Sequence, residues 1–380
     1  MIPLLYALRN LFRRLDQTIQ LIIGSVIVIL LIMSASAMND AMENTLLNSG
    51  NPNNIIVLGA GSEESVERSE VNAGVDEIIA SSILGIRQIL GKPAVSPEVH
   101  FNGLITVMNA SSNQALIRGV NYQALWVHEE VRIIEGNYPN TGEAMVGRLA
   151  YLKLGCNSTD LKVGNYIEFN EEKIKISGVF DAPGTVLEAE IWMPLQDLMT
   201  YTKRDTVSCV VVRTQGLDAT EELDLLSKKR LDLEIVTMPE SRYYKRVSEF
   251  YTPIRWMSWV CAILISTGAL LGGLNSINAA FSERKKEFGT LQAIGFKRIR
   301  ILFSILQETI IISFLALIIS AIIISLLGGI SIPYSIGVFE LDYSIVQFII
   351  GIITTLLIAL IGALIPAAKL LLPRVPNTLR

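Results

Sequence analysis

Four long apolar stretches constrain the fold of this 380-residue chain more than any other feature. They cover residues 17–39, 256–282, 301–327 and 343–368, and the only charged residue among them is Glu308. Each stretch is long enough to cross a hydrocarbon core of about 30 Å as a helix. We therefore expect a membrane protein with four transmembrane helices.

The first stretch has a competing interpretation, because Ala35-Ser36-Ala37 resembles a signal-peptide cleavage site. The apolar run is longer than a usual signal core, however. Leucines in residues 4–15 recur at alternating four- and three-residue spacing, with arginines on other faces. We interpret 1–16 as a cytoplasmic amphipathic helix at an anionic membrane surface, or simply as a positive flank, and 17–39 as the first span.

The distribution of positive charge predicts the topology. Residues 282–300 contain the densest cluster of lysine and arginine, and the tail at 369–380 is also basic. The short loop at 328–342 contains neither residue type. The positive-inside rule therefore places both termini and residues 282–300 in the cytoplasm.

Residues 40–250 have a different character, with short apolar runs separated by Gly, Asn, Ser and Pro. We expect a large α+β extracytoplasmic domain, inserted between the first and second membrane helices. Strands are predicted at 54–58, 103–108, 114–120, 133–136, 144–146, 166–169, 173–180, 207–213 and 233–237, and helices at 75–82 and 217–229. Aromatic residues between Tyr243 and Trp259 mark the approach to the second span, expected over 254–281.

Composition excludes several functions. Neither His100 nor His128 has a metal-ligand partner at a recognised spacing, so we expect no metal site and no catalytic or cofactor-binding residues in this chain. A net charge of −4 argues against a nucleic-acid binder. Cys156 and Cys209 could form a disulfide, although two unrelated thiols are the simpler interpretation.

Two groups inside the spans suggest contacts within the membrane. Gly268, Gly272 and Asn275 form a small-residue pattern that suits packing against a helix of this chain or of a second copy, although glycine is common in membrane helices anyway. Gln307 and Glu308 either form a buried polar contact that positions residues 282–300, or lie in the wet interface.

A family resemblance rests on two sets of motifs. Arg284-Lys-Lys-Glu-Phe-Gly-Thr-Leu-Gln-Ala-Ile-Gly-Phe296, followed by Gln307-Glu308, resembles the FtsX-domain signature of MacB-type ABC transporter permeases. Short motifs between Ile117 and Leu195, among them Glu143-Ala-Met-Val-Gly147 and Trp192-Met-Pro194, resemble the MacB-type periplasmic core domain.

The resemblance implies a permease subunit that works as a dimer, with itself or a paralogue, in a bacterial inner membrane. Two separate ATPase chains would bind ATP and magnesium, and a periplasmic adaptor and an outer-membrane channel are further possible partners. ATP-driven closure of the two ATPase chains would move the cytoplasmic segment and, through it, the extracytoplasmic domain. This movement would drive export or extraction of a hydrophobic or envelope-associated substrate. The alternative is an FtsX-like signal relay that controls an extracytoplasmic enzyme or adaptor without transport. By the family pattern the domain divides into an α/β part, near 45–118 and 203–245, and a β-rich part near 119–202.

The resemblance also makes residues 282–300 the segment that couples to the ATPase. Phe288, Leu291 and Ile294 recur at three-residue spacing and could form an apolar knob on a short helix, whereas a solvated loop would explain only the charges. The residues expected to act in coupling are Arg284, Glu287, Phe288, Gly289, Leu291, Ala293, Ile294 and Gly295.

Overall fold

The fold is taken from a computed structural model that describes residues 11–13, 15–107, 111–283, 285–327 and 329–371. It divides into two compact units. We call one the membrane unit, formed by the described residues of 1–40, 253–330 and 341–380. The other is the α+β unit, formed by Ala41–Thr252 and Ser331–Glu340.

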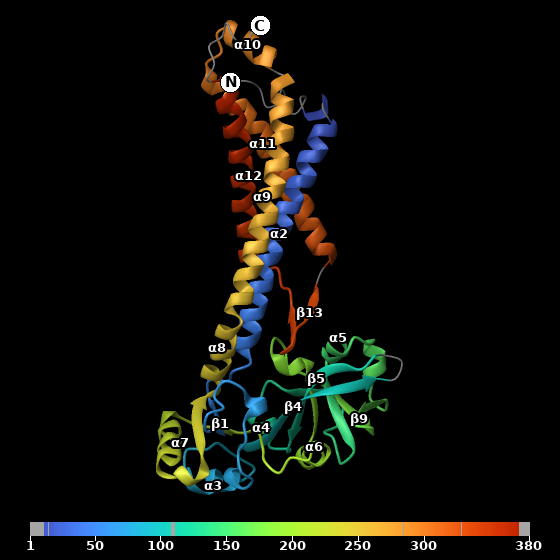
Figure 1. The fold of residues 1–380 in the computed structure, drawn as a ribbon, viewed down its shortest axis with the longest axis vertical. Helices are drawn as coiled ribbons and strands as arrows, with labels where there is room; N and C mark the ends of the chain where they lie inside the picture. The colour runs from blue at the N-terminus through green and yellow to red at the C-terminus, as the bar shows by residue number, and fades with distance from the viewer. Residues whose placement is uncertain (1–10, 14, 108–110, 284, 328, 372–380) are drawn as a thin grey trace. The chain divides into compact units, whose positions relative to one another are not determined.

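The membrane unit contains four helices that, among the described residues, are long and apolar enough to cross a membrane. They are α2 (Leu15–Asn48), α9 (Thr252–Glu283), α11 (Arg298–Leu327) and α12 (Ile345–Leu371), seen side by side in Figure 1. The predicted fold class, four membrane helices with a large domain between the first and second, is therefore confirmed. Helix α2 continues past the predicted span because Met42 and Leu46, beyond its charge-free part, are buried apolar residues at helical spacing.

Apolar residues from all four helices meet in one core of the membrane unit, which includes Ile29, Ala316, Ile358 and Leu270. Hydrogen bonds also join some of the helices. The hydroxyl of Thr309 in α11 donates to the carbonyl of Ala359 in α12 at 3.1 Å. In a bilayer such satisfaction matters because water is not present to replace a missing partner.

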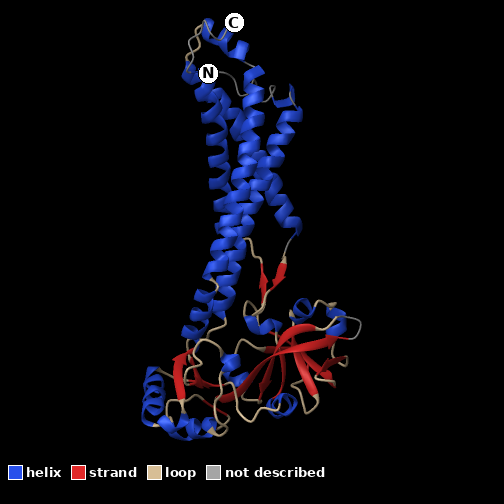
Figure 2. Ribbon diagram, in the orientation of Figure 1, coloured by secondary structure: helices blue, strands red, loops and turns tan. Residues whose placement is uncertain are grey.

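The α+β unit is built on one ten-stranded sheet, in the order β12-β1-β11-β4-β5-β10-β7-β9-β6, with β8 paired to β4 and β9. Figure 2 shows its strands in red. The strands are β1 (Asn54–Gly59), β4 (Val95–Val107), β5 (Asn113–Val120), β6 (Arg132–Gly136), β7 (Glu143–Gly147), β8 (Tyr166–Phe169), β9 (Glu172–Asp181), β10 (Ile191–Pro194), β11 (Cys209–Arg213) and β12 (Ile235–Pro239). All six residues of β1 are buried, which explains its continuous apolar sequence.

Strand β4 is long enough to pair with different neighbours along its length. Its first residues pair with β11, from Val95 to Glu98, and its later residues pair with β5, from Val99 to Ile105. The sequence predicted only the second half of this strand. The first half was missed because Pro97, Glu98 and His100 do not resemble a buried strand, although the last two are buried.

Short helices and turns complete the α+β unit. The helices are α3 (Val75–Ser82), α4 (Ala124–Val127), α5 (Ala150–Leu154), α6 (Leu195–Thr202), α7 (Leu217–Lys229) and α8 (Glu240–Phe250), with 3-10 turns at Val66–Arg68, Ser158–Leu161, Val186–Ala189 and Leu231–Leu233. A small hairpin, β2 (Gln88–Ile89) with β3 (Lys92–Pro93), lies outside the main sheet. Both helices predicted for this domain are present, as α3 and α7.

The segment between α11 and α12, expected only as a short loop, contains a hairpin that belongs to the α+β unit. Strand β13 (Ser331–Pro333) pairs with β14 (Val338–Glu340). The ammonium group of Lys153 donates to the backbone carbonyls of Tyr334 and, at 2.8 Å, Ser335. The hairpin depends on contacts with residues far away in the sequence, so local patterns could not predict it.

Candidate functional site: coupling helix and buried charged cluster

A short helix, α10 (Lys285–Ala293), lies between α9 and α11 in the chain. It ends at Ala293 and is followed, two residues later, by Gly295, whose φ of +102° is one that side-chain-bearing residues rarely adopt. The N–H of Gly295 donates to the carbonyl of Gln292 at 3.0 Å, which closes the last turn. The structure therefore contains a helix followed by a glycine turn where the coupling segment was expected.

Several of the predicted coupling residues can be placed. Glu287 and Ala293 are exposed, Gly289 is buried, and Ile294 is 70% exposed. Arg284 and the side chains of Phe288 and Leu291 lie outside the described residues. Of the three residues in the predicted apolar knob, Ile294 is the one whose side chain is described. Its exposure leaves it available to a partner.

The small-residue pattern of α9 faces away from the other helices of its unit. A Cβ atom built at Gly268 or Gly272 meets no atom within 4 Å, and Asn275 is exposed. Ala262 and Ser266, on the opposite face of the helix, are buried. The sequence left open whether this face packs against a helix of this chain or of a second copy. The structure does not bring it against another described helix of the chain.

The polar pair of α11 lies close to the packed face of that helix. Glu308 is 6% exposed, and Gln307 is half-buried. Thr309, the next residue, contributes the hydrogen bond to α12 described above. Glu308 is therefore a buried residue of the membrane unit rather than a solvated one.

The α+β unit buries a group of charged side chains, here called the charged cluster: Glu98, Arg118, His128 and Glu190. The guanidinium of Arg118 donates twice to Glu190 and once to Glu98, each at 2.7 Å. The other oxygen of Glu98 lies 2.9 Å from Nε2 of His128. The indole N–H of Trp192 donates to Glu190 at 2.8 Å, so every carboxylate has several partners.

Strand pairing builds the charged cluster. His100 of β4 lies opposite Arg118 of β5, and Arg118 lies opposite Trp192 of β10. Glu98 is two residues from His100, and side chains two apart on a strand share a face. Residues from distant parts of the chain therefore meet on one side of the sheet.

Burial and pairing act in opposite directions on these groups. Burial alone would raise the pKa of Glu98, but the charges of His128 and Arg118 outweigh it and hold that pKa well below its usual value. Burial would lower the pKa of His128, yet Glu98 and Glu130 raise it to about 10. Glu98 therefore stays ionised beside the cations of Arg118 and His128, and pairing of this kind is the condition for burying charge at acceptable cost.

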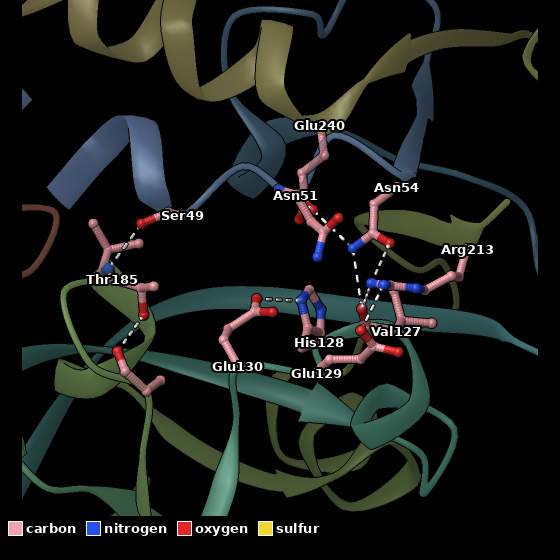
Figure 3. A network of polar contacts seen from close by, with 12 residues as sticks. Ser49, Asn51, Asn54, Val127, His128, Glu129, Glu130, Thr185, Arg213 and Glu240 are labelled. Carbon is pink, nitrogen blue, oxygen red and sulfur yellow. Dashed lines mark hydrogen bonds and ion pairs between the residues drawn. The ribbon is translucent and has the colours of Figure 1, made fainter. Parts of the chain in front are cut away.

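A second polar network, shown in Figure 3, surrounds the start of α8 and is here called the junction network: Asn51, Asn54, Arg213 and Glu240. One oxygen of Glu240 accepts from the backbone N–H of Asn51 at 3.1 Å and from the side chain of Asn54 at 2.9 Å. Arg213 donates to Glu129 at 2.6 Å and to the carbonyl of Val127 at 3.3 Å. Burial raises the pKa of Glu240 to about 7.

The junction network links segments that lead into the membrane helices. Asn51 and Asn54 follow the end of α2 within six residues, and Glu240 begins α8, which precedes α9. At the same place the hydroxyl of Ser49 accepts from the N–H of Val186 at 2.9 Å. Hydrogen bonds therefore join the residues after α2 and the start of α8 to one another and to other parts of the α+β unit.

Sequence reasoning did not find the charged cluster. His100 and His128 were expected to be ordinary domain residues, yet both contact Glu98. Cys209 is buried beside His100, and both Cys209 and Cys156 are free thiols. The alternation Glu98-Val99-His100 was the available signal, because it puts two polar side chains on one face of a strand.

Comparison with known families covers most of the chain. Residues 18–224, more than half of the sequence, match the family model of the MacB-like periplasmic core domain. Residues 259–371 match the model of the FtsX-like permease C-terminal region. No curated protein sequence matches the chain significantly.

Two solved structures are similar to about half of the chain. The periplasmic region of MacB from Actinobacillus actinomycetemcomitans is 13% identical, with a TM-score of 0.40, and the match covers 52% of this chain and 94% of that one. The extracellular domain of the noncanonic ABC-type transporter YknZ from Gram-positive bacteria is 15% identical, with a TM-score of 0.38, covering 49% and 100%. By its two family matches and its four apolar helices, the chain belongs to the MacB/FtsX-type permease family, as a multi-pass membrane protein with an extracellular domain and an ABC-type permease role.

Proposed function

We propose that this chain is the permease subunit of a MacB-type ABC transporter that passes ATP-driven motion from separate ATPase chains to its α+β unit. The motion drives export or extraction of a hydrophobic or envelope-associated substrate at a bacterial inner membrane. The observation that carries the proposal is the FtsX-like permease match over 259–371, which contains α10 between two membrane-crossing helices. ATP and magnesium are bound by the partner ATPase.

The exposed end of α10 supports a role in docking. Ile294 is 70% exposed, and the turn at Gly295 separates it from Phe296, which packs with Ile301 and Ile305 of α11. An apolar side chain held at a helix end beside a packed anchor suits insertion into a groove of a partner. The face around Ile294 is accordingly assigned to the ATPase.

The exposed face of α9 supports a dimer. In the apolar window of α9 only 11% of residues are buried, against 33–39% in the other three helices. Gly268 and Gly272 on that face allow two helix backbones to approach closely, and the amide of Asn275 can hydrogen-bond across the contact. We assign this face to a second copy of the chain or a paralogue.

The coupling assignment is tested by purifying the native complex with the variants Ile294→Glu and Leu291→Glu. Placing a carboxylate where an apolar side chain is buried by a partner costs about 1.5–3 kcal/mol or more. We therefore expect about tenfold or greater loss of co-purified ATPase, and loss of its stimulation by the permease.

Ile345→Glu provides the matched control. Ile345 is a 78% exposed isoleucine of the same unit, in the first turn of α12, where a carboxylate is tolerated. Its variant should keep the ATPase. If Ile294→Glu and Leu291→Glu both retain full binding and stimulation, α10 is not the coupling element.

A further inference from the structure

Three side chains that commonly bind metals meet beside the charged cluster: Glu98, His100 and Cys209. A carboxylate oxygen, an imidazole nitrogen and the sulfur lie within 4.8 Å of one another, and all three residues are buried. Neither the permease role nor the pairing of Arg118 with Glu190 requires a histidine and a cysteine here. This combination of donors is typical of zinc sites.

The sheet holds these donors in fixed positions. Cys209 of β11 lies directly opposite Glu98 of β4, and His100 follows Glu98 by two residues on the same face. The N–H of His100 donates to the hydroxyl of Ser208 at 3.0 Å, which adds a further tie between the two strands. Ligands on paired strands are positioned more rigidly than ligands on loops.

The separations suit a single ion. Nε2 of His100 lies 3.3 Å from Oε2 of Glu98 and 3.9 Å from Sγ of Cys209. Ligand atoms held at 2.0–2.3 Å from zinc in tetrahedral geometry are about 3.3–3.8 Å apart. Small side-chain adjustments would therefore bring all three donors to one ion.

Arg118 is compatible with a cation at this position because its charge is already paired. All three guanidinium nitrogens donate to carboxylates, Nε and one terminal nitrogen to Glu190 and the other terminal nitrogen to Glu98. A carboxylate offers about four lone-pair sites, so Glu98 can accept from Arg118 and from His128 and still bind a metal. Hydrogen bonds of this kind commonly orient the carboxylates that ligate metals.

A cavity lies on the His100 side of these donors. It has a volume of about 850 Å³ within the α+β unit and is lined by His100, Arg118 and Glu190, by residues 61–68 and by α8, whereas Glu98 and Cys209 lie behind its lining. An ion could enter through it, and a water molecule could occupy a fourth coordination position from that side. Three protein ligands with one open position is a common zinc arrangement.

We propose that Glu98, His100 and Cys209 form a binding site for a zinc-type divalent cation, with a fourth position open to the cavity. Thiolate and imidazole ligands favour zinc over calcium or magnesium, which prefer oxygen ligands. On binding, the thiol of Cys209 releases its proton to solvent and the sulfur bonds to the ion.

The test uses the purified full chain, freed of metal by a chelator and titrated with Co²⁺, which reports thiolate ligation by a charge-transfer absorption band. We expect saturation at one ion per chain, displacement by Zn²⁺, and loss of the band in Cys209→Ser. Cys156→Ser, which removes a half-buried thiol of the same unit, should keep the band. Binding that does not saturate, or a band that survives in Cys209→Ser, would overturn the proposal.

A second variant separates ligand loss from unfolding. His100→Gln keeps a polar side chain of similar size and should weaken Co²⁺ binding at least about tenfold. Circular dichroism and thermal unfolding without metal show whether each variant folds. Added Zn²⁺ should raise the Tm of the wild type and leave the Tm of His100→Gln and Cys209→Ser unchanged. A folded His100→Gln that binds as tightly as the wild type also contradicts the site.

Discussion

The charged cluster of the α+β unit and the exposed residues of the membrane unit use their side chains in opposite ways. Arg118 and Glu98 are 2% and 0% exposed and satisfy each other within the chain. Ile294 and Gly268, by contrast, are turned away from the packed interior of their unit. The first pair contributes to the stability of the fold, whereas the second pair leaves the chain's own stability almost unaffected and is free to meet other molecules.

Substitutions in these two regions should therefore change different properties of the protein. A buried ion that loses its partner remains in a medium of low polarity, so the loss is large and intrinsic to the fold. Substitution of an exposed residue of the membrane unit should change assembly without changing the stability of the monomer. Measurements of unfolding and of association should therefore respond to different residues.

The largest effect is expected from Arg118→Met. It leaves Glu98 and Glu190 buried without their common cation, which should lower the free energy of unfolding of the α+β unit by about 3–5 kcal/mol. Denaturant unfolding of the purified chain, followed by tryptophan fluorescence, measures it, since Trp192 lies against Arg118.

Arg230→Met is the matched control for that experiment. Arg230 forms an exposed ion pair with Asp232, a type of contact that contributes little. Its substitution should leave unfolding unchanged. An equal change in the free energy of unfolding for the two variants would contradict the expected difference between buried and exposed charges.

An intermediate effect, dependent on pH, is expected from Glu240→Gln. Burial raises the pKa of Glu240 from 4.5 to about 7, so the folded state keeps a proton that the unfolded state has lost between these pH values. Stability from this group is therefore present at low pH and is lost as pH rises through about 7. The variant has no such proton, so its loss of stability between pH 5 and pH 8 should be smaller by about 1–3 kcal/mol.

The stability that His128 contributes also falls over part of this range, because its pKa is raised to about 10. Since Glu240 is one of the charges that raise it, the difference between wild type and variant reports Glu240 together with its interaction with His128. Parallel unfolding curves of the two proteins at every pH would contradict the assignment. Glu172→Gln, at an exposed position of β9, should reproduce the wild-type pH profile.

The smallest effect on unfolding is expected from Gly268→Ile, because a Cβ atom built there has open space around it within 4 Å. The same change should block close approach of a second α9 and lower the dimer fraction several-fold, measured by analytical ultracentrifugation in detergent. Thr267→Ile, turned about 100° around the helix, should dimerise as the wild type does. A dimer fraction unaffected by Gly268→Ile would place the protomer contact elsewhere.

Hydrophobic patterns were sufficient to predict the membrane helices and several strands. The charge-free runs at 17–39 and 343–368 lie within α2 and within α12 and the residues just before it. Strand β1 and helix α3 also follow from local sequence. In each case the residues that define the pattern are neighbours in the chain, so a short window contains the information.

The clusters of polar residues could not be predicted in this way. Glu98 and Cys209 are opposite one another only because β4 and β11 pair, with more than a hundred residues between them. A glutamate such as Glu98 is not expected in a buried strand unless cationic partners neutralise its charge. Arg118 and His128 are those partners. A pattern search judges each polar residue alone, whereas burial of charge depends on partners supplied by topology.

The hairpin of β13 and β14 has a mechanical consequence. The α+β unit is connected to the membrane unit through α2, through the start of α9 and, because Ser331–Glu340 is one of its own parts, through both ends of the segment between α11 and α12. The chain therefore passes between the two units four times, and two of these passages flank the hairpin. Cutting the chain within the hairpin would leave every membrane helix intact but would free the two new ends, so that Ser331–Glu340 would no longer tie the units through one continuous segment.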